Sequence, residues 1–155
     1  MFRIHALPLS TFEPLFALSD EQLAARDIRR VVADGRPAFP CRVSLRDAVE
    51  GERLLLLPHE HHAGATPYRA SGPIYVREDA EQAMPAVDEV PELLRRRVLS
   101  VRAYGTDGMM RAADVVDGIE VESAIARAFA MPDVDYLHLH NAKPGCYACR
   151  VTRED

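Results

Sequence analysis

Short runs of alternating apolar and polar residues recur along the chain and predict strands. Segment 2–7 alternates with the period of a half-buried strand, and segments 28–32 and 74–77 are also expected to be strands. Segment 52–58 differs because it contains four consecutive leucines, and such a run predicts a strand that is buried on both faces. We therefore expect 52–58 to be a central strand.

Two strand pairs in the second half of the chain are expected to form hairpins. Segments 98–105 and 109–116 are joined by a short turn that contains Asp-Gly, a step that readily adopts left-handed turn conformations. Segments 136–142 and 146–153 flank a turn that contains Pro-Gly. The second pair forms a C-terminal β-hairpin.

Helix signals are short and lie between the strands. Ser19 and Gln22 have the spacing of a capping box, which predicts a short helix through Arg26. Segment 44–49 is expected to form a helical turn. Segment 59–72 contains turn-forming residues and no hydrophobic periodicity, so it is expected to be a loop.

Two further helices follow the first half of the chain. Pro91 suits the first turn of a short helix through Arg97, since a helix start needs no backbone N–H from that residue. Asp117 can cap a helix over 118–130, which has apolar residues on one face and Pro132 beyond its end.

These elements together predict the fold class and the domain organisation. No repeat, low-complexity tract or linker divides the chain. The pattern predicts one α+β domain over residues 1–155, with a mixed or mainly antiparallel sheet and two or three short covering helices.

Composition excludes several classes of protein. The chain has 155 residues, 48% of them hydrophobic, and a net charge of −5. Basic residues are scattered apart from Arg95–Arg97, which argues against a nucleic-acid partner. No apolar run approaches the roughly 18 residues that a membrane span needs. The first residues do not resemble a secretory signal and the three cysteines are an odd count, so we expect a cytoplasmic protein with free thiols.

Three segments resemble a known family. Segments 39–48, 67–76 and 136–151 are similar, in the same order, to bacterial domain-of-unknown-function family 1203. The family has no assigned reaction, so the resemblance implies no catalytic role for any residue. Near the end of the chain, His140 and the run Gly145-Cys-Tyr-Ala148 resemble a histidine and a Gly-Cys-Tyr-Ala run in the family's pattern.

The C-terminal hairpin contains the pair Cys146-Tyr-Ala-Cys149, whose spacing is typical of zinc and redox sites. Along a strand, however, residues three apart point to opposite faces of the sheet. The two thiols then cannot bind one ion, so we assign no metal ligand and no cofactor.

His138 and His140 are two residues apart and share a strand face, but their neighbours depend on the turn. A four-residue turn places His138 opposite Cys149 and His140 opposite Tyr147. A two-residue turn places His140 opposite Cys149, and a three-residue turn places Cys146 on the histidine face. The three registers stay open.

His140 and Cys146 are the candidate catalytic residues, because a nearby imidazole lowers the pKa of a thiol and makes it a nucleophile. Asn141 is a candidate oxyanion donor. Cys41 is a second candidate nucleophile. The alternative is a hairpin with hydrogen-bonded histidines and cysteines that are small core residues.

Two other groups of residues carry potential chemistry. His59-Glu-His-His62 has the composition of a metal loop but lacks the His-Glu-x-x-His spacing, so a solvated loop is favoured, and this loop could still border a pocket. Arg42, Arg69 and Arg150 could bind carboxylate or phosphate, or could instead pair with the 24 acidic residues.

The leading hypothesis is a pocket for a small anionic ligand, either in an enzyme that uses a thiol and an imidazole or in a binding protein. The alternatives are a non-catalytic homodimer that uses the same hairpin as its interface and a metalloprotein. The candidate ligand-binding residues are Arg42, Arg69, His138, Asn141 and Tyr147.

Overall fold

The structure is a computed structural model that describes residues 1–154. The chain divides into two compact units, which we describe separately. Unit 1 contains Met1–His5, Glu60–Gly72 and the residues from Met84 onward. Unit 2 contains Ala6–His59 and Pro73–Ala83.

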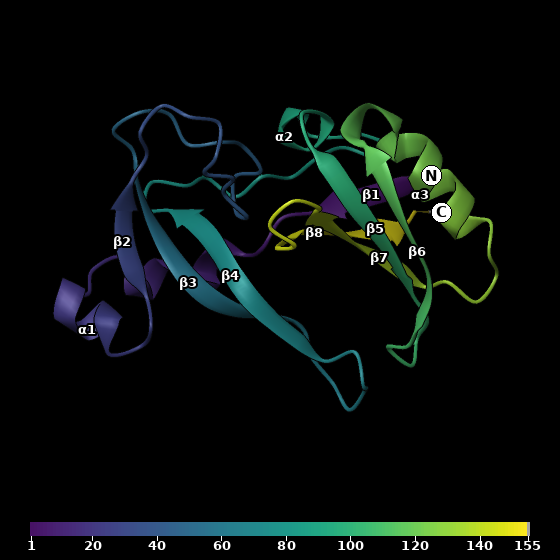
Figure 1. The fold of residues 1–155 in the computed structure, drawn as a ribbon, viewed down its shortest axis with the longest axis horizontal. Helices are drawn as coiled ribbons and strands as arrows, with labels where there is room; N and C mark the ends of the chain where they lie inside the picture. Colours follow the sequence, from purple (N-terminus) through teal and green to yellow (C-terminus); the bar gives the residue numbers. More distant parts are fainter. Residues whose placement is uncertain (155) are drawn as a thin grey trace. The chain divides into compact units, whose positions relative to one another are not determined.

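Unit 1 is built on a five-stranded antiparallel sheet with the strand order β1-β8-β7-β5-β6 (Figure 1). The unit also has two helices. In the chain, α2 (Glu92–Arg95) precedes β5, and α3 (Val121–Phe129) lies between β6 and β7 and packs on β5 and β6. The strands are β1 (Phe2–His5), β5 (Val98–Tyr104), β6 (Met110–Asp117), β7 (Tyr136–Asn141) and β8 (Tyr147–Arg153).

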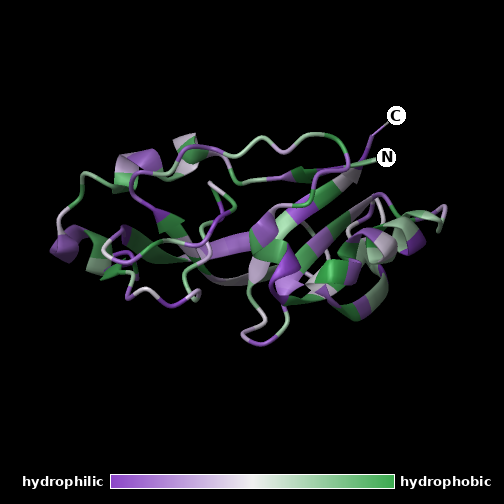
Figure 2. Ribbon diagram, turned by 90° about the horizontal axis from the view of Figure 1, so that it is seen from above, coloured by the Kyte–Doolittle hydropathy of each residue, from purple (hydrophilic) through white to green (hydrophobic). Residues whose placement is uncertain are grey.

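The two faces of this sheet differ in polarity because side chains alternate along each strand. Figure 2 shows hydrophobic and hydrophilic residues alternating along the strands. On one face, Leu137 and Leu139 of β7 lie beside Val101 of β5, and all three are almost completely buried. His138 and His140 point to the opposite face, as the alternation predicted.

The start of α3 is fixed by a cap and a close backbone approach. The Asp117 side chain accepts a hydrogen bond from the N–H of Ile119, which confirms the predicted cap. A 3₁₀ turn, η3 (Gly118–Glu120), precedes α3. A Cβ atom on Gly118 would lie only 2.1 Å from the carbonyl oxygen of Leu94, so this position requires glycine.

Unit 2 contains the first part of β3 and the last part of β4, in a three-stranded sheet with the order β2-β3-β4. The central strand has Leu54, Leu55 and Leu57 buried, and they contact two different groups of core residues. This confirms the predicted central strand. The elements are η1 (Leu9–Thr11), η2 (Glu13–Leu15), α1 (Asp20–Ala24), β2 (Arg29–Val32), β3 (Arg53–His62) and β4 (Ala70–Arg77).

The capping box is present at the start of α1. The Ser19 side chain accepts a hydrogen bond from the N–H of Gln22, and the Gln22 side chain accepts one from the N–H of Ser19. The helical turn expected over 44–49 is wrong. Leu45 has a φ of +48°, a left-handed conformation that cannot continue a right-handed helix.

The loop expected over 59–72 is also wrong, because β3 continues to His62 and β4 begins at Ala70. The strand expected over 52–58 therefore extends beyond Pro58, although proline has no N–H to donate. β2 pairs only with residues Arg53 to Leu56 of β3, so Pro58 lies beyond that pairing. Proline is tolerated in a strand where one side has no partner.

Unit 2 also contains a partly buried charge network. Glu52 accepts hydrogen bonds from Arg77 and Arg46, and its closest oxygen lies 2.8 Å from Arg77 and 2.7 Å from Arg46. The side chain of Arg77 is only 7% exposed. A guanidinium so far removed from water needs this carboxylate.

The fold class is confirmed: the chain is α+β, with antiparallel sheets, short helices and a C-terminal hairpin of β7 and β8. The organisation as one domain stays a prediction. None of the helices in residues 1–154 combines the length and apolarity that crossing a membrane requires.

Candidate functional site

Two buried histidines lie on the polar face of β7. The side chains of His138 and His140 belong to residues that are 4% and 0% exposed. Their cross-strand partners on β8 are Arg150 and Tyr147, and Tyr147 lies edge-on to both imidazole rings. The strand therefore places two imidazoles side by side, away from water.

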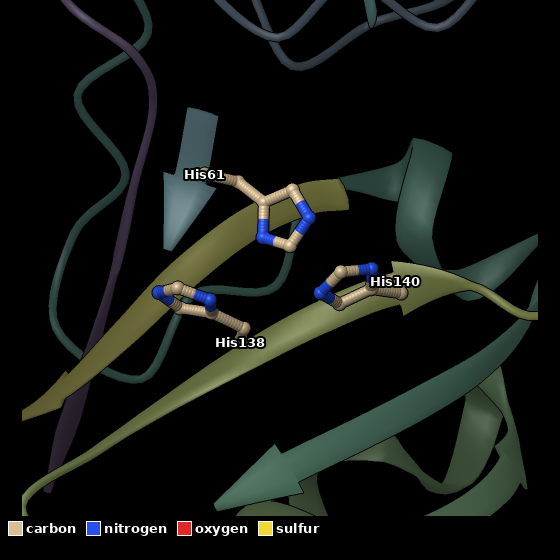
Figure 3. Close-up of side chains that lie close together, drawn as sticks. All are labelled: His61, His138 and His140. Carbon is tan, nitrogen blue, oxygen red and sulfur yellow. The ribbon is translucent and has the colours of Figure 1, made fainter. Parts of the chain in front are cut away.

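A third imidazole comes from the end of β3. The His61 ring centroid lies 4.8 Å from that of His140 and 6.1 Å from that of His138. Its ring also stacks on Tyr147 at 5.5 Å with an interplanar angle of 9°. Figure 3 shows His61 reaching from β3 toward the two histidines of β7. All of these residues belong to unit 1.

These three residues, which we call the histidine cluster, have the arrangement of a metal site. One nitrogen from each of His61, His138 and His140 lies within 4.8 Å of the others. Around a tetrahedral zinc ion with Zn–N distances of about 2.0–2.1 Å, ligand nitrogens are about 3.3 Å apart. Shifts of about 1 Å in each side chain would close the cluster around an ion.

Burial keeps His138 in the neutral form that a metal requires. Its pKa is lowered from 6.5 to about 2, first by burial and then by the charges of His140, His62, His61 and Arg150. Nδ1 of His138 is buried and has no hydrogen-bond partner in residues 1–154. A neutral imidazole nitrogen without a proton is a good ligand for a transition metal.

The C-terminal hairpin turn orients the ring of His140. Its Nδ1 atom lies 3.1 Å from the carbonyl oxygen of Gly145, which can only accept a hydrogen bond. Nδ1 therefore carries the proton and Nε2 holds the lone pair. This kind of contact to a backbone carbonyl typically fixes the tautomer of a metal ligand. The turn allows it because Gly145 has a φ of +76°.

An aromatic group adjoins the histidine cluster within unit 1. His62 is buried, and its Nε2 atom lies 2.8 Å from the hydroxyl oxygen of Tyr136. Its ring stacks on Tyr104 at 4.3 Å and lies edge-on to His138. Burial lowers the pKa of His62 and raises the pKa of Tyr104. These contacts exclude water from one side of the cluster and hold His138 in place.

The register of the C-terminal hairpin agrees with the four-residue turn at one of its two expected pairs and differs at the other. His140 lies opposite Tyr147, as a four-residue turn predicts. The accompanying expectation that His138 faces Cys149 is wrong, because a β-bulge leaves Ala148 outside the regular pairing. Cys149 instead lies opposite Leu139 on the apolar face and is fully buried.

Cys146 and Asn141 lie together at the turn. The side-chain amide of Asn141 donates a hydrogen bond to Sγ of Cys146, at 3.4 Å. Cys146 is half-buried, whereas Cys41 is fully buried in the core of unit 2. A nucleophilic pair of Cys146 and His140 stays a prediction.

Two of the three arginines that could bind an anion have other partners. Arg42, in unit 2, is 2% exposed and donates a hydrogen bond to the carbonyl oxygen of Pro40. Arg69, in unit 1, pairs with Glu60 at 2.9 Å. Anion binding by Arg42 and Arg69 stays a prediction.

The sequence reasoning missed His61 as a member of the site. We assigned 59–62 to a solvated loop because 59–72 has turn-forming residues and no hydrophobic periodicity and because Pro58 and Gly64 argue against a helix. A strand that continued from the leucines would have alternated through His61. The His-x-His spacing of His59 and His61 repeats that of His138 and His140, and both pairs lie on strands. That repeated spacing was the available signal.

Comparisons with known proteins give a family and no activity. The model of the family described as Protein of unknown function (DUF1203) matches residues 38–153, a range that includes His61, His138 and His140. Neither the search of curated proteins nor that of solved structures found a match. The family match covers most of the chain and confirms the resemblance seen in the sequence, so the chain belongs to the DUF1203 family of proteins of unknown function.

Proposed function

We propose that this protein binds a divalent transition-metal ion through His61, His138 and His140. The observation that carries the proposal is the convergence of three imidazole nitrogens within 4.8 Å of one another. They come from two strands that are far apart in the sequence, and two of the three residues are buried.

The energetics of burial support this proposal. A buried polar atom without a hydrogen bond costs free energy, and Nδ1 of His138 is such an atom within residues 1–154. A metal–nitrogen bond would offset this cost. The low pKa of His138 means that protons do not compete for this ligand near neutral pH.

The ligand set indicates which metals and which chemistry to test. Three imidazoles suit zinc, copper, nickel or iron rather than magnesium or calcium, which prefer oxygen. Three protein ligands leave the fourth tetrahedral position open, as in catalytic rather than structural zinc sites. Zinc in such a position lowers the pKa of a bound water to about 7, which would supply a nucleophile for hydrolysis or hydration.

The test is metal binding by protein from which any affinity tag has been removed. The protein is stripped with a chelator and titrated with Zn²⁺ in a calorimeter, and with Co²⁺ as a spectroscopic probe. We expect one ion per chain and an absorption spectrum typical of four-coordinate cobalt. The variants His61→Ala, His138→Ala and His140→Ala should each weaken binding by more than the 10–100-fold typical of changes beyond the direct ligands.

His59→Ala is the matched control, because His59 lies two residues before His61 on the same strand and contacts Phe12 in unit 2. Its zinc affinity should equal that of the unchanged protein. Circular dichroism of each variant separates loss of a ligand from loss of the fold. Folded histidine variants that bind zinc as the unchanged protein does would refute the proposal.

A second candidate function uses the thiol of Cys146. The side-chain amide of Asn141 donates a hydrogen bond to Sγ of Cys146 and could orient the sulfur for attack. If Cys146 is a nucleophile, alkylation by iodoacetamide should be faster at pH 7 than for an ordinary thiol and should slow in Asn141→Ala. Equal rates would refute this candidate. A homodimer stays a prediction that light scattering tests.

A further inference from the structure

The histidine cluster is flanked by two arginines in one row across the sheet of unit 1. On β8, Arg150 lies directly opposite His138, and on β5, Arg102 lies directly opposite it on the other side. Directly opposite residues point to the same face, with Cβ atoms about 4.5–5.5 Å apart. Two guanidinium groups therefore lie on the same face as the cluster.

Arg150 is held in place by an aromatic ring and not by an acid. Its Cζ atom lies 4.2 Å from the centroid of the Tyr136 ring. Within residues 1–154 it forms no ion pair.

Arg102 is also without a carboxylate partner in the described part of the chain. Its Nε atom donates a hydrogen bond to Oγ of Ser100 at 3.3 Å. Other arginines of unit 1 do have carboxylate partners. Arg95 pairs with Glu122, and Arg111 pairs with Asp107 and Asp133.

Charge balance then indicates the kind of ligand. The chain has more acidic than basic residues, yet the row that contains His138 has two arginines and no carboxylate. Three neutral imidazoles leave the charge of a divalent ion uncompensated, and the two guanidiniums add to it. An anion at the open metal position would neutralise both, and guanidinium forks suit the oxygens of carboxylate and phosphate.

We propose that the metal-loaded site binds a small oxyanion, a carboxylate or a phosphate, with one oxygen on the metal ion and another held by Arg150 and Arg102. This inference rests on the proposed metal-binding function. It gives the proposed open position a substrate class, namely small molecules that carry a carboxylate or phosphate group.

The test titrates the cobalt-loaded full-length protein with inorganic phosphate, with acetate and with acetamide as a neutral analogue of acetate. The cobalt spectrum reports ligands that enter the coordination sphere. We expect phosphate, acetate or both to change the spectrum in a saturable manner, and acetamide to have no effect. The anion that binds more tightly indicates whether the substrates carry a phosphate or a carboxylate group.

Arginine variants test the anion contacts. Arg150→Gln and Arg102→Gln should each weaken anion binding by about tenfold or more, and Arg150→Lys should lose less because it keeps the charge. Arg111→Gln is the control, because its charge is already paired with Asp107. All four variants should bind cobalt at least as tightly as the unchanged protein does, since none removes a metal ligand.

The outcomes separate the two proposals. Tight cobalt binding without saturable anion binding, or anion affinity unchanged in both glutamine variants, overturns the oxyanion inference and leaves the metal site intact. Absence of cobalt binding overturns the metal site and, with it, the inference that rests on it. Anion affinity that falls only in Arg150→Gln and Arg102→Gln supports both.

Discussion

The hydrogen bonds of Glu52 give a stability prediction that can be worked from the structure. Replacing Glu52 by Gln keeps the size and shape of the side chain and removes its charge. Buried Arg77 then keeps an amide oxygen as its partner but loses a carboxylate, as does Arg46. We expect Glu52→Gln to destabilise the fold at pH 7.

The magnitude follows from the pKa of Glu52, which is lowered from 4.5 to about 2. The hydrogen bond from Arg46 contributes most, burial opposes it, and the N–H of Val49 and Arg77 contribute further lowering. At about 1.4 kcal/mol per pKa unit this corresponds to about 3.4 kcal/mol. Because the Glu52 side chain is 24% exposed, solvent screening reduces the expected loss to about 2 kcal/mol.

The same interaction predicts the pH dependence of stability. A carboxyl whose pKa is lower in the folded than in the unfolded state contributes its full stabilisation above pH 4.5 and loses it as the pH falls toward 2. Glu52→Gln mimics the protonated side chain at every pH. The difference between the two proteins should therefore shrink by about 1 kcal/mol between pH 7 and pH 3.5.

Urea denaturation followed by far-UV circular dichroism measures these differences, which suits a chain without tryptophan. Glu50→Gln is the control, because Glu50 is exposed and should contribute less than about 0.5 kcal/mol. A loss in Glu52→Gln no larger than that of the control would refute the reasoning. So would a difference that is the same at pH 7 and at pH 3.5.

Three further changes test other parts of the fold. Gly118→Ala should cost about 3 kcal/mol in urea denaturation, because its Cβ would overlap the carbonyl oxygen of Leu94, whereas Gly72→Ala has open space and should stay within about 0.5 kcal/mol. Ser19→Ala should lose about 1 kcal/mol in the same assay through the missing cap, and an unchanged midpoint would contradict that. Leu139→Ala should cost about 2–5 kcal/mol yet leave the zinc affinity of the folded protein unchanged, and a parallel loss of zinc affinity would contradict the two-faced sheet.

Local pattern was enough to predict most of the fold. Caps and turns are short-range features, so the capping box at Ser19, the cap at Asp117 and the hairpin turn near Gly108 were visible in the sequence and are present. Strand alternation likewise placed His138 and His140 on one face. Each of these depends on residues only a few positions apart.

The candidate site was only half predictable, because its geometry depends on distant residues. His61 meets His140 across about 80 positions of sequence, and no local period reports such a contact. The left-handed conformation of Leu45 and the bulge at Ala148 are likewise set by packing and not by residue type. The thiol-based hypothesis arose because these long-range features were not in the sequence pattern.

The bulge at Ala148 shifts the pairing of β8 with β7 by one residue, so it changes which β8 side chains lie on the face of the histidine cluster. Without it the pairing would continue from His140 and Tyr147 so that Cys149 came to lie beside His138, in the place that Arg150 occupies. A thiolate there would offer the histidine cluster a fourth ligand and fill the position that a substrate would use. If the histidine cluster binds a metal ion as proposed, this one extra residue keeps a fourth protein ligand out of the site.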